Sequence, residues 1–222
     1  MIELERRDDV FVLHLRGGEN RFNRSFLSEL NRALDQVEKS SPPAALVTTG
    51  EGKFYSNGLD LAWLGGEGSD RAGPFLAEVH QLFARVLSFP TATVAAVNGH
   101  AFAGGGMLAL AHDFRVMRAD RGYFCLPEID LGLPLQPGMT AIIRARLSAA
   151  TAHEAIVTGR RYGGEEATRV GIADEAVPEE QVLPRAVERA AALADKDRTT
   201  LAALKEGLYR TTLAILRGEA QG

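Results

Sequence analysis

Residues 91–109 read TATVAAVNGHAFAGGGMLA, and most of what the sequence says about architecture is in this segment. Its first seven residues are β-branched or small and apolar, which predicts a buried strand at Thr91–Val97. A Gly-rich turn follows, and the run after Gly104 is compatible with a helix. The segment KFYSNGLDLA at 53–62 has the same form, because it follows a short buried strand expected at 44–49 and also enters a helix.

Backbone N–H groups at two such helix starts have no acceptor within their own helices. They attract negative charge, and two of them from separate turns can converge on one oxygen, which is how an oxyanion hole is built. The same glycines can also serve only tight turns and close packing. The residues alone leave both interpretations open.

The flanking segments alternate between strand and helix patterns. We expect strands at 10–15 and 44–49, and helices at 23–38 and 75–89, with Asn23 or Ser25 capping the first helix. This order is typical of βαβ units with parallel, buried strands, so the predicted fold class is α/β. The glycines of Gly65–Gly73 indicate a mobile surface loop. Beyond about residue 145 the pattern is mostly helical, at 149–158, 164–169, 179–194 and 199–216.

Composition excludes several classes of protein. The 222 residues are 45% hydrophobic and 24% charged, which are ordinary globular values. A net charge of −4 argues against a nucleic-acid partner or an anionic membrane surface. The lone Cys125 rules out an internal disulfide framework, and no stretch approaches about 18 uninterrupted apolar residues. We therefore expect a cytoplasmic protein without a membrane partner.

Several common catalytic and binding motifs are incomplete or absent in this sequence. Gly99 and Gly104 have P-loop spacing, but glycine follows where that loop needs lysine and a hydroxyl. Neither a Gly-x-Gly-x-x-Gly dinucleotide motif nor a Gly-x-Ser-x-Gly nucleophile elbow is present. His153-Glu154 begins like a zinc helix, but Val157 occupies the position of the second histidine. The sequence predicts no metal.

The order of the remaining motifs resembles the crotonase, or enoyl-CoA hydratase/isomerase, superfamily. The matching segments are FYSNGLDL at 54–61, TVAAVNGHA at 93–101, Gly104-Gly105, Asp113, and LPEIDLG at 126–132. The resemblance implies a crotonase-like spiral of ββα/βαβ turns with a C-terminal helical region. It also implies an acyl-CoA-binding core at 1–195, a C-terminal helix at 196–222 at a subunit interface, and a homotrimer or dimer of trimers. No separate cofactor is expected, because coenzyme A is part of the substrate.

The resemblance assigns the oxyanion hole to the backbone N–H groups of Leu59 and Gly104. Family hydratases use two glutamates around a water, and the corresponding positions here are Met107 and Glu128. A thioether cannot transfer protons. One glutamate suffices for an isomerase, because the same base can take a proton from C2 of a 3-enoyl thioester and return it to C4.

Segments around 21–23, 56–63, 112–115 and 117–122 resemble the Δ3,Δ2-enoyl-CoA isomerases in particular. That resemblance makes Glu128 the expected proton shuttle and Arg21 and Lys53 candidate contacts for the CoA phosphates. The other residues expected to bind substrate lie in the two turns or along the acyl tunnel: Ser56, Asn57, Gly58, Asp60, Trp63, Leu64, Phe75, Gly105, Met107 and Leu133.

Two alternatives remain open from sequence. The chain can be a hydratase or another crotonase-family acyl-CoA enzyme, for example a thioesterase or decarboxylase. It can also be a non-catalytic acyl-CoA-binding protein that has kept the fold. Glu128 argues against a pure binder, which needs no ionisable group beside the thioester, and Met107 argues against a standard hydratase.

Overall fold

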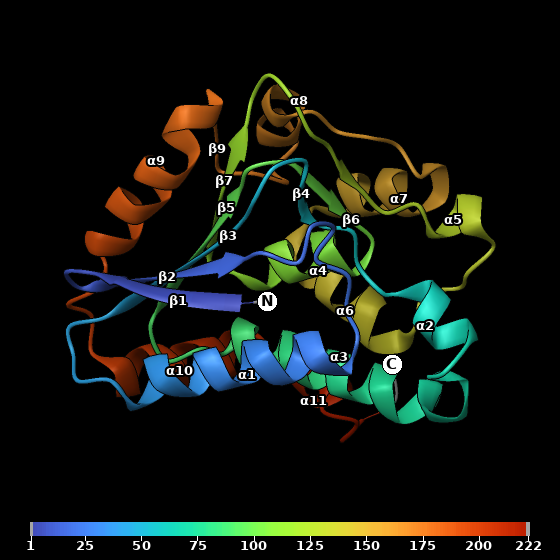
Figure 1. Cartoon of the computed structure of the whole chain (residues 1–222), viewed down its shortest axis with the longest axis horizontal. Helices are drawn as coiled ribbons and strands as arrows, with labels where there is room; N and C mark the ends of the chain where they lie inside the picture. Colours follow the sequence, from blue (N-terminus) through green and yellow to red (C-terminus); the bar gives the residue numbers. More distant parts are fainter. Residues whose placement is uncertain (1, 221–222) are drawn as a thin grey trace.

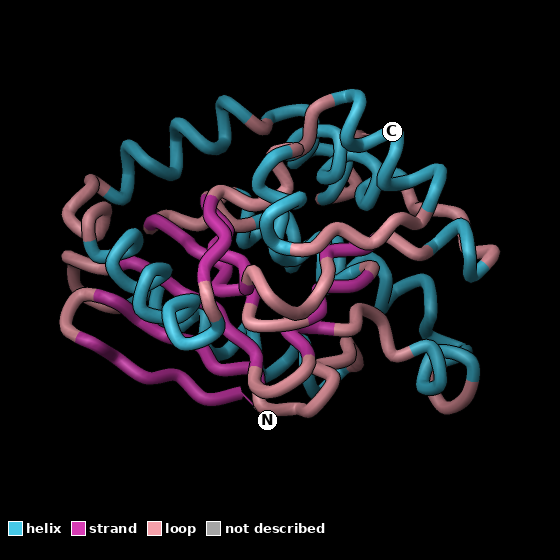
Figure 2. Tube along the Cα trace, turned by 90° about the horizontal axis from the view of Figure 1, so that it is seen from above, coloured by secondary structure: helices cyan, strands magenta, loops and turns pink. Residues whose placement is uncertain are grey.

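The Ala92–Val97 strand (β5) lies inside a six-stranded sheet in the computed structural model, which describes residues 2–220. The strand order is β1-β2-β3-β5-β7-β9, with β1 and β2 antiparallel and the other neighbours parallel. Figure 2 shows these strands side by side, with β1 at one edge. The remaining strands are β1 (Ile2–Arg7), β2 (Val10–Leu15), β3 (Ala45–Gly50), β7 (Phe114–Arg118) and β9 (Glu175–Val177).

A second, three-stranded sheet is built from the segments that leave the large sheet. It consists of β4 (Phe54–Ser56), β6 (His100–Phe102) and β8 (Phe124–Cys125), all parallel, in the order β4-β6-β8. Each follows a strand of the large sheet, and each is followed by a helix: α2 (Leu61–Gly65), α4 (Gly104–Ala111) and α5 (Glu128–Leu131). Because the three strands are parallel neighbours, the chain leaves them toward the same edge of the small sheet.

Helices cover both faces of the large sheet, as parallel strands require (Figure 1). Helix α9 packs across β2, β3, β5 and β7 on one face. Strand side chains alternate between the two sides, so that Val12 packs in the cluster under α9 and Leu13 in the main core. The helices not yet given are α1 (Arg24–Lys39), α3 (Ala72–Leu87), α6 (Pro137–Arg146), α7 (Ala149–Thr158), α8 (Gly164–Arg169), α9 (Glu179–Ala191), α10 (Arg198–Leu208) and α11 (Arg210–Leu216), with a 3-10 turn at Ser69–Arg71.

The expected α/β order is confirmed, with differences at element ends. Asn23 caps α1 by accepting a hydrogen bond from the Phe26 N–H at 3.0 Å. Helix α3 begins at Ala72, ahead of the expected start, because proline is tolerated in a first helical turn. The helix expected at 199–216 is divided at Tyr209, whose φ of −107° and ψ of 18° leave the helical region. Strands β1, β7 and β9 and the short strands of the small sheet were not expected from sequence.

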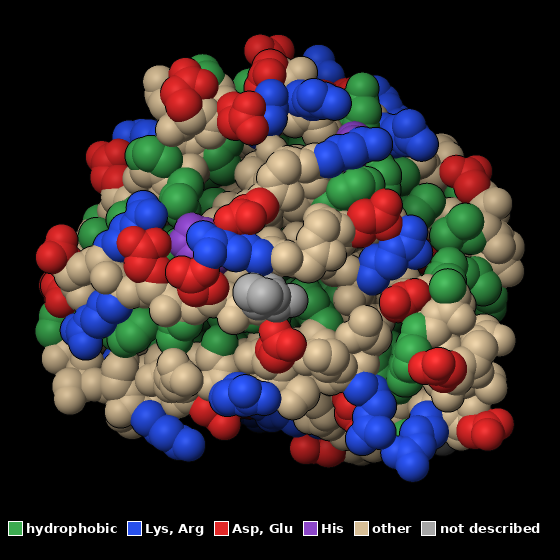
Figure 3. Space-filling view, in the orientation of Figure 1, with side chains coloured by type: hydrophobic (Ala, Val, Ile, Leu, Met, Phe, Trp, Pro, Cys, Tyr) green, Lys and Arg blue, Asp and Glu red, His purple; other side chains and the backbone are tan. Residues whose placement is uncertain are grey.

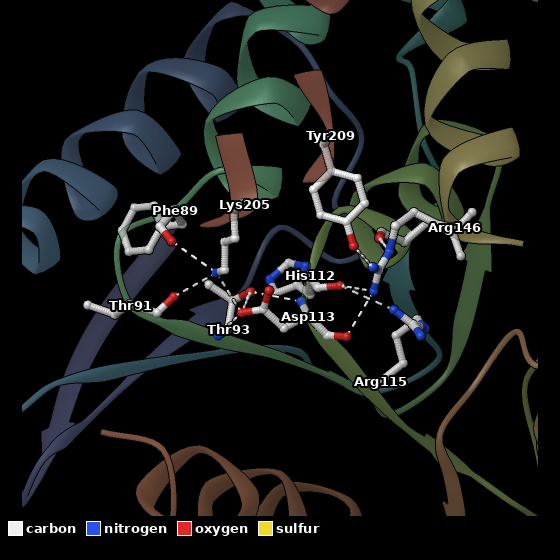
Figure 4. Close-up of polar contacts among 10 residues, drawn as sticks. Phe89, Thr91, Thr93, His112, Asp113, Arg115, Arg146, Lys205 and Tyr209 are labelled. Atoms are coloured by element: carbon white, nitrogen blue, oxygen red, sulfur yellow. Dashed lines mark hydrogen bonds and ion pairs between the residues drawn. The ribbon is translucent and has the colours of Figure 1, made fainter. Parts of the chain in front are cut away.

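A buried lysine fastens the C-terminal helices to the large sheet (Figure 4). Lys205 of α10 donates to the carbonyls of Phe89 and Thr91 and to Oδ2 of Asp113, at 2.9, 3.0 and 2.7 Å. The same Asp113 oxygen accepts from the Thr93 N–H at 2.8 Å. Since the Lys205 ammonium has three acceptors, one of them a carboxylate, this buried charge is paired and ties α10 to the start of β5 and the end of α4.

Candidate active site

A cavity of about 610 Å³ opens where the ends of the small sheet meet α2, α3 and α6. Its lining is mostly apolar, and of the described residues that line it only Arg21 and Glu128 are charged. The other lining residues are Asn57, Leu59, Leu61, Leu64, Gly65, Ala72, Leu76, Phe102, Ala103, Gly104, Pro127, Leu131, Leu133, Pro134, Gln136 and Met139. A deep apolar cavity with a few convergent polar groups is typical of a ligand site.

The first turn leaves one backbone donor free beside the cavity. Leu59 forms an isolated parallel bridge with Phe22, in which the Phe22 N–H donates to Gly58 O at 2.7 Å and the Asp60 N–H donates to Phe22 O at 2.9 Å. This pairing does not use the Leu59 N–H, which has no acceptor among residues 2–220. Gly58 has a φ of +74°, a conformation that side chains strain.

The second donor lies at the start of α4, whose residues are all buried. The Gly104 N–H is the first of the helix, so it has no intrahelical acceptor, and the helix dipole adds partial positive charge there. Ala103 precedes it with φ 49° and ψ −124°, a conformation that costs a non-glycine residue about 1–3 kcal/mol. Ala103 lines the cavity, and the sequence gives no sign of its strained conformation.

Glycine contacts bring the two donor turns together. A Cβ built on Gly58 would lie 2.8 Å from the Gly104 nitrogen, and one built on Gly105 would lie 2.3 Å from Ser56 O. Real Cβ atoms do not approach other atoms so closely, so both positions exclude side chains. Ser56 also holds the first turn, because its Oγ donates to Asn20 O at 2.8 Å and accepts from the Gly58 N–H at 3.2 Å.

Glu128 is the first residue of α5 and reaches the cavity from the third strand of the small sheet. Its Oε2 is buried and has no hydrogen-bond partner among the described residues. Burial raises the pKa of this carboxyl above its usual range, and a backbone hydrogen bond opposes the shift. An unpartnered carboxyl with raised proton affinity suits a group that takes up and returns a proton.

The expected site residues fall into three sets. Those on the cavity wall are Arg21, Asn57, Leu59, Leu64, Gly104, Glu128 and Leu133. Ser56, Gly58 and Gly105 lie behind it, where they shape the two turns, and Trp63, Phe75 and Met107 pack in or against the core. Lys53 and Asp60 lie outside the cavity, in separate surface grooves.

The side chains off the wall have identifiable structural contacts. Asp60 caps α2 by accepting from the Trp63 N–H at 3.1 Å. Trp63 packs edge-on against Phe75 with ring centroids 4.8 Å apart. Met107 is fully buried in the core. Lys53 lies over the Phe54 ring, with its Nζ 5.4 Å from the centroid.

Arg21, the cationic side chain of the cavity lining, forms an ion pair. Arg21 pairs with Glu19, and Glu19 also accepts from Nδ2 of Asn57 at 3.0 Å. Over the face shown in Figure 3, acidic and basic side chains are interspersed. Arg21 is the one cationic side chain among the described residues that line the cavity.

Sequence reasoning missed much of the wall that α3 and α6 contribute. Leu76, Gln136 and Met139 line the cavity but were not among the expected site residues. Their position depends on the packing of distant helices, for which the sequence carries no local signal. Leu61, Ala72 and Phe102 were missed for the same reason.

The described residues contain neither a metal-binding cluster nor a membrane-spanning helix. Within residues 2–220 no three His, Cys, Asp or Glu side chains are grouped closely enough to hold a metal ion. No helix in the described part of the chain has the length and apolar character needed to cross a membrane.

Comparison with known proteins gives concordant matches. The family model described as enoyl-CoA hydratase/isomerase matches residues 5–220. Enoyl-CoA delta isomerase 2, peroxisomal, of Arabidopsis thaliana is 37% identical over 228 aligned positions, covering 97% of this chain and 95% of that protein. Enoyl-CoA delta isomerase 3 of the same plant is 36% identical, covering 94% and 92%. The crystal structure of a probable enoyl-CoA hydratase from Mycobacterium tuberculosis superposes with a TM-score of 0.91 at 29% identity, covering 98% of this chain and 92% of that one.

Proposed function

This chain belongs to the enoyl-CoA hydratase/isomerase family, and from that premise we propose that it is an isomerase that moves the double bond of a 3-enoyl-CoA to the 2-trans position. The observation that carries the proposal is a single carboxylate on the cavity wall. Glu128 is the one acidic side chain among the described lining residues. A proton shuttle between C2 and C4 needs one such group, whereas activation of a water between two carboxylates needs two.

The thioester oxygen is bound by the N–H groups of Leu59 and Gly104 in this proposal. Removal of the C2 proton places negative charge on that oxygen, and donors already fixed at the site stabilise the resulting enolate without rearrangement. The helix dipole of α4 adds to the effect, because its positive end lies at Gly104. Loss of one such donor typically lowers the rate by about 10²–10³.

Glu128 takes the proton from C2 and returns it to C4. Burial favours the neutral carboxylic acid that exists between these two transfers, and the apolar wall keeps water away from the enolate. Atoms balance, since the proton removed at one carbon is replaced at another. The double bond shifts into conjugation with the carbonyl.

Met107 supports isomerisation over hydration. It occupies the position at which the family's hydratases have a second glutamate, and its side chain is fully buried in the core. It therefore supplies no second proton-transfer group with which to activate a water.

The direct test supplies the purified protein with a 3-enoyl-CoA and follows absorbance of the conjugated thioester. We expect turnover to the 2-enoyl product, and no comparable loss of absorbance when a 2-enoyl-CoA is supplied. Rapid hydration of the 2-enoyl-CoA would instead support a hydratase. Tight binding of both esters without any turnover would support a non-catalytic acyl-CoA-binding protein.

A further inference from the structure

Three buried polar side chains form a chain of hydrogen bonds behind the cavity. Tyr55 OH lies 2.7 Å from Thr48 Oγ1, and Thr48 Oγ1 lies 2.9 Å from His112 Nε2. His112 Nδ1 lies 2.8 Å from Leu108 O. Tyr55 and His112 are fully buried, Thr48 is 3% exposed, and none of the three lines the cavity.

Donor and acceptor chemistry fixes the direction of each hydrogen bond in this series. The Leu108 carbonyl can only accept, so His112 carries its proton on Nδ1 and, in the neutral ring, accepts at Nε2. Thr48 therefore donates its hydroxyl proton to His112 and accepts from the Tyr55 hydroxyl. Neutral His112 is the form that burial favours. Each of the three side chains is then satisfied in one arrangement only.

These hydrogen bonds join α4, which carries the Gly104 donor, to β4, the strand that leads into the turn with the Leu59 donor. Tyr55 lies in β4, four residues before Leu59, and His112 is the C-cap of α4, whose first residue is Gly104. Thr48 links them from β3 of the large sheet. At the other end of α4, about 12 Å away by the helical rise, Gly58 and Gly104 are in contact. One end of α4 is thus held against the turn after β4, and the other end is linked to β4 itself.

The far end of α4 is fixed further by Arg146 (Figure 4). Its guanidinium donates to the carbonyls of Leu110, His112 and Asp113 at 2.9, 2.9 and 2.8 Å. These contacts hold the helix end in place along its axis. Among the side-chain hydrogen bonds of the described residues, however, only those of Tyr55, Thr48 and His112 link this end of α4 to β4.

We propose that Tyr55, Thr48 and His112 are positioning residues that fix the Leu59 and Gly104 N–H groups relative to each other, so that both reach one thioester oxygen. This inference rests on the proposed function, because it takes those two N–H groups as the oxyanion hole. A donor pair displaced by a fraction of an ångström binds the ground state nearly as well but stabilises the enolate less.

The test compares single-atom changes at the chain with matched controls. Tyr55→Phe removes one hydroxyl, and Thr48→Val removes both links while keeping the side-chain shape. Thr48→Ser retains the hydroxyl and serves as the conservative rescue. Tyr162→Phe is the matched control, because Tyr162 is also a fully buried ring, and its hydroxyl donates to Glu154 at 2.8 Å, away from both donor turns.

Three quantities are measured on each variant: kcat with a 3-enoyl-CoA, Kd for a saturated acyl-CoA, and the infrared carbonyl stretch of that bound thioester labelled with ¹³C. We expect Tyr55→Phe and Thr48→Val to lower kcat about 10-fold and to change Kd less than about threefold. Both variants should also move the frequency of the carbonyl stretch back toward its value in water. Thr48→Ser and Tyr162→Phe should retain the wild-type kcat and frequency.

Wild-type kcat and carbonyl frequency in folded Tyr55→Phe and Thr48→Val would overturn the inference and leave the chain a purely structural contact. If Thr48→Val does not fold, Tyr55→Phe decides alone, because it removes a single oxygen. The saturated thioester does not react, so the frequency reports on the donors independently of isomerisation. A wild-type frequency equal to that in water would instead contradict the oxyanion hole of the proposed function.

Discussion

Gly58 and Gly104 belong to different turns, yet a Cβ on Gly58 would lie only 2.8 Å from the Gly104 nitrogen. This contact sets the separation of the two proposed donors, because Leu59 follows one glycine directly and the other carries the second N–H. Gly58 also has a φ of +74°, so both its backbone conformation and its surroundings exclude a side chain.

Gly58→Ala is expected to lower kcat by at least about 10², since the added methyl group must push the two donors apart. Gly52→Ala is the matched control, because Gly52 has a φ of +65° but nothing within 4 Å of its built Cβ. Both variants should lose about 1 kcal/mol or more of unfolding free energy through backbone strain. Steady-state kinetics and urea denaturation measure the two effects, and equal turnover in both variants would refute the contact's role.

Ala103→Gly is expected to raise the free energy of unfolding by about 1 kcal/mol, because glycine adopts the φ of 49° and ψ of −124° without strain. The gain is smaller than the strain itself, since glycine has more conformational entropy in the unfolded chain. Urea denaturation measures the change. A lower unfolding free energy in Ala103→Gly would contradict this expectation, because it would show that the strain at Ala103 is smaller than the entropic cost of glycine.

Stability should fall in a defined acidic window because of His112. Burial lowers the pKa of this imidazole to about 4. The hydrogen bond to Leu108 and the charge of Asp113 oppose this shift, whereas the charges of Arg115 and Lys205 add to it. Between about pH 6.5 and 4 the unfolded chain binds a proton that the folded chain does not, so the free energy of unfolding falls as pH falls. At about 1.4 kcal/mol per pH unit the total loss approaches about 3 kcal/mol.

His112→Gln removes the titrating group and should flatten that slope, whatever its effect on stability at neutral pH. Denaturation measured at several pH values through the window compares the slopes of the two proteins. Parallel slopes in wild type and His112→Gln would contradict the buried neutral imidazole.

Assembly as a homotrimer or a dimer of trimers remains a prediction from family resemblance. Leu213 and Leu216 of α11 are buried within the chain, whereas Leu204 and Leu208 of α10 are 65% and 74% exposed. We expect a trimeric or hexameric mass in analytical ultracentrifugation and a smaller species for Leu204→Glu combined with Leu208→Glu. A monomeric mass for the wild type at micromolar concentration would contradict the prediction.

Local patterns were sufficient for the elements that bear the donors. The strand before Asn98 and the glycines at 104–106 predicted a turn into a helix, and the resemblance placed Leu59, Gly104 and Glu128, all of which lie on one cavity wall. Strands of two or three residues, such as Phe124–Cys125, were missed because they are too short to show a period.

Side chains set by long-range packing were harder to place. Met107 was expected along the acyl tunnel but lies in the core, and Leu76 and Met139 line the cavity because α3 and α6 meet there. The helical run at 199–216 gave no sign of the break at Tyr209. The Tyr55–Thr48–His112 chain joins residues up to 64 positions apart, which no local pattern reveals.

The most direct test of the central claim is the isomerisation rate of Glu128→Gln on a 3-enoyl-CoA. Glutamine keeps the size and hydrogen-bonding capacity of the side chain but cannot act as a base, so kcat should fall by at least about 10²–10⁴ while the Kd for a saturated acyl-CoA stays near wild type. Asp130→Asn, two residues along α5 and outside the cavity lining, should retain activity. Activity of Glu128→Gln within about threefold of wild type would contradict the single-glutamate mechanism.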